Sequence, residues 1–233
     1  MKNNETTGMP GTLKDLSKTW IREATRQKNG FSFMTWLGRP ILQIGSDLMA
    51  LQEIIWNLKP EFIIETGIAH GGSTIFYASM LELLGGSGKV ISIDIEIRDH
   101  NRKAIEEHPL SKRVELIQGS SIDPATVAKV AALVNQRSAL VILDSNHTHD
   151  HVLEELRLFS PFVRKGSYLI VFDTAIDDMP DDFFPDRPWK KGNSPKSAVH
   201  QFLKENNRFV IDTAIEEKIL LTVAPDGFLK CIE

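Results

Sequence analysis

The chain has 233 residues, of which 42% are hydrophobic and 25% are charged, a composition typical of a soluble globular protein. Its 27 basic and 31 acidic residues give a net charge of -4, which argues against a dedicated nucleic-acid binder. Cys231 is the only cysteine and excludes an intramolecular disulfide and a cysteine-based zinc site. We find no signal-peptide pattern and no apolar run long enough to span a bilayer, so we expect a cytoplasmic protein.

The first 59 residues differ from the rest. We expect residues 1–59 to form an N-terminal helical appendage, followed by a larger domain of residues 60–233. A helix is predicted at Leu48–Leu58, and Pro60 stops it because the residue before a proline avoids helical angles. This region also gathers large aromatic residues: Trp20, Phe31, Phe33 and Trp36. They can pack in the core, cover an active site or join subunits, and we expect a homo-oligomer.

From residue 60 onward, short β-branched runs alternate with longer amphipathic runs, a pattern typical of parallel strands joined by crossover helices. The predicted strands are Phe62–Thr66, Val90–Asp94, Val114–Gln118, Leu140–Asp144 and Tyr168–Asp173. The predicted helices are Ser73–Leu84, Arg98–Glu107, Pro124–Val134, Asp150–Val163 and Pro195–Asn206. Two closing strands are expected at Phe209–Thr213 and Ile219–Val223. The predicted fold class is therefore α/β: a Rossmann-like, mostly parallel seven-stranded sheet with an antiparallel edge and helices on both faces.

A glycine-rich turn follows the first predicted strand, with the sequence Glu65-Thr66-Gly67-Ile68-Ala69-His70-Gly71-Gly72-Ser73. A dinucleotide-binding turn needs glycine where Ala69 stands, and a P-loop needs lysine where Ser73 stands. Both NAD and nucleoside triphosphates are therefore disfavoured. S-adenosylmethionine fits this turn, with its carboxylate at the N-terminus of the helix near Ser73 and its ammonium near Glu65.

Two further strand ends extend this expected cofactor cleft. Asp94 ends the second strand, where a carboxylate can accept hydrogen bonds from both ribose hydroxyls. Ser120 and Ser121 follow the third strand and suit the edge of the adenine ring. An acid at a strand end is also typical of a helix cap, but three such signals at successive strand ends favour a cofactor site.

Two aspartates end the fourth and fifth predicted strands. If these strands are neighbours, Asp144 and Asp173 project into one cleft, where hard oxygen ligands suit Mg²⁺. A cation there lowers the pKa of a substrate hydroxyl and helps it to attack a methyl group. The alternative is that both aspartates only cap helices.

Three histidines follow Asp144 within seven residues. His147 can serve as a general base, because a near-neutral pKa suits proton removal. A zinc hydrolase using His147 and His149 is an alternative, although the spacing departs from the usual metallo-hydrolase run. His149 and His151 are also typical of the exposed start of a helix, and we expect them to be mostly structural.

Several short segments match a known family. They are Trp36–Gly38, Pro40–Gln43, Asp47–Met49, Ile64–Gly67, Gly71–Ser73 and Ile93–Ile95. With them the chain resembles the cephalosporin hydroxylase family, whose members are similar to class I S-adenosylmethionine-dependent O-methyltransferases that act in cephamycin methoxylation or on sugar hydroxyls. The resemblance implies the Rossmann-like fold of class I methyltransferases for this chain. It also implies a set of cofactor-binding residues: Glu65, Gly67, Ala69, Gly71, Ser73, Asp94, Ser120 and Ser121.

The same resemblance implies that Asp144 and Asp173 bind the metal, and we add Thr174 as a hydroxyl that can complete the set. In the similar catechol and macrolide-sugar O-methyltransferases, a basic residue follows the first metal aspartate by three positions, which His147 matches. Antibiotic-pathway members carry an acid where this chain has Phe172, and catechol enzymes carry asparagine where it has Thr174. Two aspartates with a hydroxyl or a water can still complete the set.

The loop Asp177–Pro188 follows the second metal strand, a place where insertions usually shape an acceptor pocket. Phe183, Phe184 and Trp189 can stack on a sugar or another ring. We predict a Mg²⁺-assisted O-methyltransferase that acts on a hydroxyl of a sugar, glycan or small natural product. One alternative is a cofactor-binding accessory protein without turnover. The other is the zinc hydrolase, which the histidine spacing supports less well.

Overall fold

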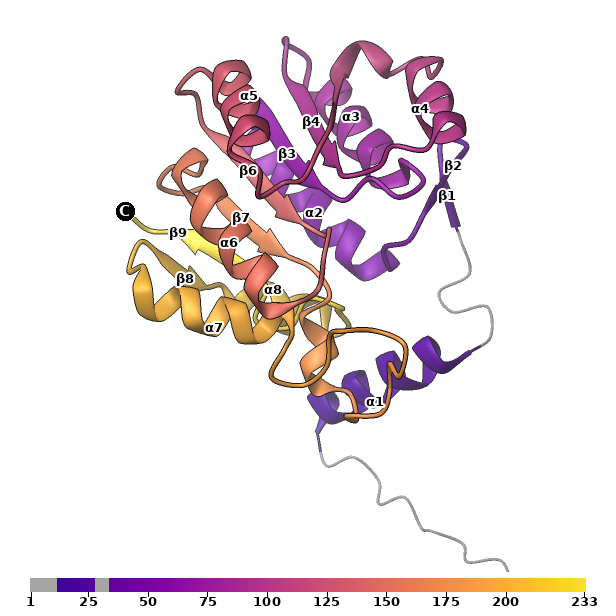
Figure 1. Ribbon diagram of the computed structural model, residues 1–233, viewed down its shortest axis with the longest axis vertical. Coiled ribbons are helices and arrows are strands. Elements are labelled where there is room, and N and C mark those ends of the chain that lie inside the picture. The colour runs from indigo at the N-terminus through magenta and orange to yellow at the C-terminus, as the bar shows by residue number, and fades with distance from the viewer. Residues whose placement is uncertain (1–11, 28–33) are drawn as a thin grey trace, which may run out of the picture.

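The computed structural model describes residues 12–27 and 34–233, and a seven-stranded sheet forms its centre (Figure 1). The strands lie in the order β5-β4-β3-β6-β7-β9-β8. Their bounds are β3 Phe62–Thr66, β4 Lys89–Asp94, β5 Val114–Gln118, β6 Ala139–Leu143, β7 Tyr168–Val171, β8 Phe209–Ile211 and β9 Phe228–Cys231. Strands β3 to β7 pair in parallel, whereas β9 is antiparallel to β7 and β8. The predicted fold class, including its antiparallel edge, is confirmed.

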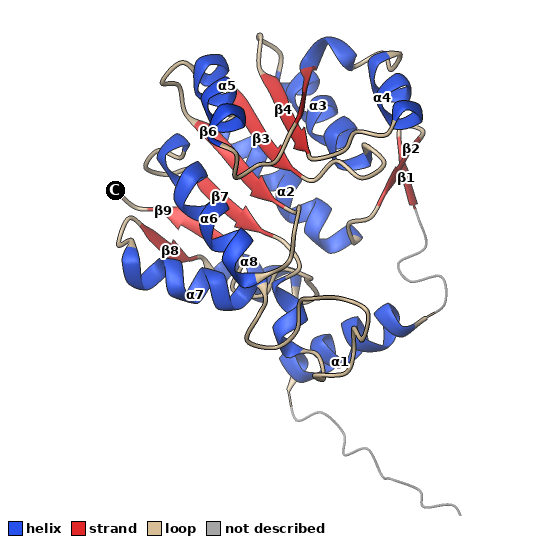
Figure 2. Ribbon diagram, in the orientation of Figure 1, coloured by secondary structure: helices blue, strands red, loops and turns tan. Residues whose placement is uncertain are grey.

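Helices cover both faces of the sheet, because alternate side chains of each strand point to opposite sides. Ile63 of β3 packs into the core beneath α2 (Gly45–Leu58) and α3 (Gly72–Leu84). Its neighbours Phe62 and Ile64 pack into the core on the other face. The helices of that second face are α5 Pro124–Val134, α6 His149–Phe159 and α7 Pro195–Glu205 (Figure 2).

The N-terminal region contributes more than the one helix expected there. It contains α1 (Leu13–Arg26), a two-stranded hairpin of β1 (Met34–Trp36) and β2 (Arg39–Ile41), and α2, which includes the predicted Leu48–Leu58. Trp36 donates a hydrogen bond to Ser79 and packs edge-on against Phe76, so it belongs to the core. Trp20 is half-exposed, and Phe31 and Phe33 lie outside the described residues. Within the described ranges no helix has both the length and the apolar character needed to cross a membrane.

One predicted strand is wrong. Residues 213–219 form helix α8 (Thr213–Ile219), and Leu221 to Val223 follow as an irregular segment rather than as a strand. Side chains of α2 form hydrogen bonds with backbone groups that strand pairing would need. Ser46 donates to the carbonyl of Leu221, and Asp47 accepts from the amide of Val223 at 3.0 Å. The closing strand is instead β9, which the sequence pattern did not reveal.

Candidate active site

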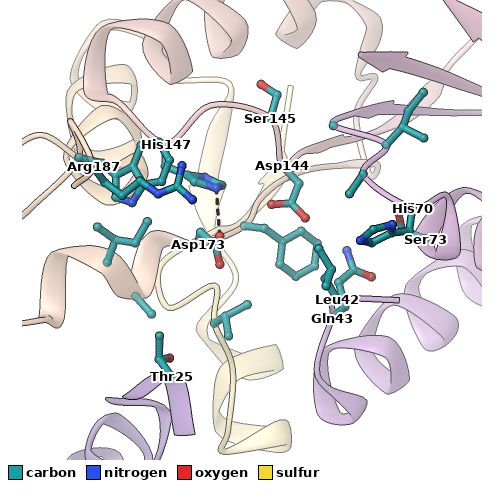
Figure 3. Close-up of a pocket in the computed structure, with 18 of the residues that line it drawn as sticks. Thr25, Leu42, Gln43, His70, Ser73, Asp144, Ser145, His147, Asp173 and Arg187 are labelled. Carbon is teal, nitrogen blue, oxygen red and sulfur yellow. Dashed lines mark ion pairs between the residues drawn. The ribbon is translucent and has the colours of Figure 1, made fainter. Parts of the chain in front are cut away.

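A cavity of about 1080 Å³ opens beyond the carboxyl ends of the parallel strands (Figure 3), the position at which doubly wound sheets bind ligands. One side is formed by the glycine-rich turn and Asp94, and the other by the ends of β6 and β7. Predicted site residues that line it are Gly67, Ala69, Ser73, Asp94, Asp144, His147 and Asp173. The fold therefore brings the expected cofactor turn and the expected metal ligands to one cavity.

Gly67 joins these two sides. Its φ is +89°, and a Cβ placed on it would lie 2.0 Å from the backbone oxygen of Asp144. No side chain fits between the turn after β3 and the turn after β6, so glycine is required there. Gly71 precedes α3 as its N-cap residue, is buried, and does not line the cavity.

Asp94 lies at the end of β4 and is held by two backbone amides. One carboxylate oxygen accepts from the amide of Ile68 at 2.8 Å, and the other accepts from the amide of Glu96 at 3.1 Å. Each carboxylate oxygen can accept more than one hydrogen bond. The side chain therefore keeps acceptor capacity toward the cavity that it lines, as a ribose-binding acid requires.

Glu65 lies deeper than expected. Its carboxylate accepts from the hydroxyls of Ser73, Thr74 and Ser92, the last two at 2.6 and 2.7 Å. Burial raises the pKa of Glu65 to about 7, although these three hydroxyls oppose the shift. Glu65 is not among the residues that line the cavity. It links β3, α3 and β4, and its predicted contact with an ammonium stays a prediction.

Ser121 and Ser120 also lie outside the lining of this cavity. Ser121 Oγ is 3.1 Å from His151 Nε2, and the same nitrogen is 3.3 Å from Ser145 Oγ. His151 therefore joins the turn after β5 to the turn after β6. The contact of these serines with an adenine ring stays a prediction.

Asp144, His147 and Asp173 converge on one point. One ligand atom from each lies within 4.8 Å of the others, and His147 Nε2 is 3.2 Å from Asp173 Oδ2. Figure 3 shows the three side chains pointing toward one another from the ends of β6 and β7. Asp173 has a left-handed φ of +56°, because the chain turns sharply here into the short 3₁₀ segment η3 (Thr174–Asp178).

Electrostatics at this cluster favour a cation. Burial, followed by the nearby negative charges of Asp173 and Glu65, raises the pKa of Asp144 well above its ordinary value. Two carboxylates that share a partly buried site repel each other when both are ionised, and a divalent cation between them removes that penalty. Two carboxylates offer the hard oxygen ligands that such a cation accepts.

Thr174 does not join this cluster. Its side chain is fully buried, it donates to the carbonyl oxygen of Pro225 at 2.6 Å, and it does not line the cavity. Phe172 is buried and also lines the cavity. The predicted role of Thr174 as a metal ligand therefore has no geometric support.

His149 is directed away from the cluster. Its Nδ1 lies 2.8 Å from Ser197 Oγ and its Nε2 lies 3.0 Å from Gln201 Oε1, both on α7. Both ring nitrogens are therefore occupied in joining α6 to α7. This arrangement removes the second histidine that the zinc-hydrolase interpretation needs.

The far end of the cavity is lined by aromatic and apolar groups. Trp189 meets the ring of His147 edge-on with centroids 4.9 Å apart, and the Arg187 guanidinium lies 5.1 Å from the Trp189 ring centroid. Phe184 also lines the cavity, whereas Phe183 lies beneath Arg26 of α1. The loop after β7 thus forms part of the wall, as the sequence suggested.

Sequence reasoning missed the five lining residues from the N-terminal region: Ile21, Thr25, Pro40, Leu42 and Gln43. The two α1 residues give no distinctive signal, because they belong to an ordinary amphipathic helix. Gln43 is a lone amide within the apolar run Ile41–Ile44, a signal that could have been noticed. The stretch before residue 60 therefore contributes directly to the site.

Comparisons with known proteins establish the family of the chain. A family model described as Rhamnosyl O-methyltransferase/CmcI matches residues 29–232. The Rhamnosyl O-methyltransferase of Mycobacterium tuberculosis is 32% identical over 201 residues, which cover 84% of this chain and 77% of that protein. The Mycobacterium leprae protein of the same name is 32% identical over 198 residues, with coverage of 84% and 82%.

Solved structures show the same fold. A structure of CmcI described with Mg and SAM has a TM-score of 0.58 at 17% identity and covers 86% of this chain and 77% of that one. The calicheamicin methyltransferase CalS11 has a TM-score of 0.53 at 12% identity, with coverage of 79% and 77%. On the family model and the sequence relatives, the chain belongs to the Rhamnosyl O-methyltransferase/CmcI family.

Proposed function

We propose that this protein is an S-adenosylmethionine-dependent O-methyltransferase that acts on a hydroxyl of a sugar-bearing acceptor, with help from Mg²⁺. The convergence of Asp144, His147 and Asp173 on the cavity that also receives the glycine-rich turn is the observation that supports it best. The names of the relatives, which are rhamnosyl O-methyltransferases, support the reaction and the sugar acceptor. CmcI described with Mg and SAM or with SAH supports the two cofactors.

Different residues of the cavity have different roles in this proposal. Gly67, Ser73 and Asp94 would border the cofactor, and the carboxylate of Asp94, which the amide of Ile68 holds in place, would accept hydrogen bonds from its ribose. Asp144 and Asp173 would hold the cation, which would lower the pKa of a hydroxyl placed beside it.

At the acceptor end of the cavity, His147 accepts the proton of that hydroxyl. Its ring is held in place by Asp173 and Trp189.

The acceptor lies between the metal cluster and the aromatic end of the cavity. The walls there come from Phe184, Trp189 and α1, and aromatic rings pack well against the apolar face of a sugar. A small glycoside or the end of a glycan fits this description.

The experiment is direct. Purified protein is titrated with S-adenosylmethionine by calorimetry and then incubated with methyl-labelled cofactor, Mg²⁺ and a panel of rhamnosides, other glycosides and phenols. We expect binding and transfer to at least one glycoside. Absence of binding contradicts the proposal, and binding without transfer to any acceptor favours the accessory protein.

We also propose that the protein acts in the cytoplasm as a homo-oligomer, with residues 1–59 as an appendage to the domain of residues 60–233. Met49 and Trp56 support a contact between copies: they lie seven residues apart on α2, hence on one face, and are 64% and 49% exposed. Light scattering after size-exclusion chromatography tests this, and a monomer at all concentrations contradicts it.

A further inference from the structure

Gln43 has an unusual position in the cavity wall. Its side chain is only 9% exposed and lines the cavity. Its Nε2 donates to the hydroxyl of Tyr77 at 3.3 Å, whereas its Oε1 has no hydrogen-bond partner among the described residues. A buried acceptor without a donor is unfavourable, so a bound molecule that supplies a donor gains affinity there.

The surrounding backbone fixes Gln43 beside the start of α3. A Cβ on Gly72 would lie 2.2 Å from the carbonyl oxygen of Pro40 and 2.6 Å from Ile41 Cα, so the segment before Gln43 presses directly on the first turn of α3. Arg39 adds hydrogen bonds to the carbonyl oxygen of His70. Figure 3 shows the Gln43 amide between Asp144 and the Ser73 side of the cavity.

The start of α3 suits an anion. Its N-cap residue is Gly71, which offers no capping side chain, and its first turn contains no acid. The first amides of a helix have no partners within the helix and attract negative charge. A ligand that places a carboxylate there and an ammonium beside it, as an amino acid does, brings donors to the orphan oxygen of Gln43.

Glu65 was the other candidate for the ammonium, but its carboxylate already accepts from three hydroxyls and does not line the cavity. We infer that Gln43 Oε1 accepts a hydrogen bond from the α-ammonium of S-adenosylmethionine, which makes Gln43 a cofactor-binding residue. The inference rests on the proposed function. It assigns to the N-terminal region a direct part in holding the methionine end of the cofactor.

The test compares two ligands that differ only at this end. The full-length protein and its Gln43→Met variant are titrated by calorimetry with S-adenosylhomocysteine and with 5′-methylthioadenosine, which lacks the amino-acid group. A hydrogen bond to a charged donor predicts about 10- to 100-fold weaker binding of S-adenosylhomocysteine by the variant. Binding of 5′-methylthioadenosine should stay within twofold. Gln52→Met, the same exchange on α2 away from the cavity lining, should change neither affinity.

A second variant identifies the interacting atom. Gln43→Glu keeps an acceptor and should bind S-adenosylhomocysteine more tightly than Gln43→Met does. If Gln43→Glu instead binds S-adenosylhomocysteine more weakly than Gln43→Met does, the amide NH₂ of Gln43 is a donor to the cofactor's carboxylate, and the inference is overturned. Equal losses for both ligands, or no loss, also overturn it. A wild-type protein that binds neither ligand contradicts the proposed function, and the inference falls with it.

Discussion

Glu65 and Asp144 lie at the ends of neighbouring strands, yet their surroundings differ. The pKa of each carboxyl is raised chiefly by burial. Glu65 is surrounded by three hydroxyl donors and faces the interior, whereas Asp144 faces the cavity and meets a second acid, Asp173. A buried charge whose donors come from the fold itself is structural. A buried charge that meets a like charge at a cavity is prepared for a ligand.

The largest expected effect follows from removing the charge of Asp144. Asp144→Asn keeps the shape of the side chain but removes a cation ligand, so we expect methyl transfer to fall by about 10³-fold or more. Cofactor affinity should stay within about threefold. The melting temperature should not fall, since an uncompensated buried charge disappears. Initial rates, calorimetry and thermal melts check these three statements, and a variant with nearly full activity would contradict the account.

Gly67→Ala should disturb both sides of the cavity at once. Its Cβ would collide with the backbone of Asp144 in a left-handed conformation, so we expect a loss of about 3 kcal/mol or more in the free energy of unfolding. Gly86→Ala is the control: its φ is also positive, but nothing lies within 4 Å, and about 1 kcal/mol is expected. Equal losses in urea unfolding would remove the argument for a close approach at Gly67.

His147 and His149 lie on the same segment, but we expect a catalytic role for the first and a structural role for the second. His147→Ala should lower kcat about 100-fold, because it removes the proton acceptor. His149→Ala should leave kcat within about twofold and lower stability by about 1 to 2 kcal/mol, since it only loses its bonds to α7. Steady-state kinetics and melts of both variants decide the matter. A reversed pattern would instead assign the catalytic role to His149.

A separate prediction concerns the pH dependence of stability. The pKa of Glu65 is raised from 4.5 in the unfolded chain to about 7 in the folded one. Between these values the folded state holds a proton that the unfolded state has lost, so stability falls as the pH rises, by up to about 1.4 kcal/mol per unit. Asp47, with its pKa raised to about 7 by burial, adds a slope of the same sign.

Glu65→Gln should therefore unfold with a shallower pH dependence than the wild type between pH 4.5 and 7. Urea unfolding at half-unit intervals measures both slopes, and the difference between them isolates Glu65 from Asp47. Identical slopes would show that Glu65 is not protonated in the folded protein.

The strand ends were predictable because parallel strands end at the same edge of a sheet, whatever their side chains contact. That rule brought Asp94, Asp144 and Asp173 to one cavity from their sequence positions alone. The partners of Glu65 were not predictable, because Ser92 comes from a different strand and the pairing register decides which hydroxyl is within reach.

Two other features depended on contacts between distant segments. The segment Leu221–Val223 has a strand-like pattern, but side chains of α2 form hydrogen bonds with its backbone groups. The local sequence pattern gives no sign of these contacts. Gln43 lies in the cavity wall because Pro40 packs against Gly72, a contact between elements that sequence spacing does not reveal. Local patterns thus located the five parallel strands β3 to β7 and their ends, and tertiary contacts decided the rest.

The central claim is that the Asp144 and Asp173 cluster serves methyl transfer through a divalent cation. The most direct test measures the initial rate of methyl transfer to a glycoside acceptor after treatment with a chelator, and again as Mg²⁺ is added back. We predict that the chelated protein is inactive and that activity returns to saturation with Mg²⁺ in the wild type but not in Asp144→Asn. Full turnover by the chelated wild-type protein would contradict the claim.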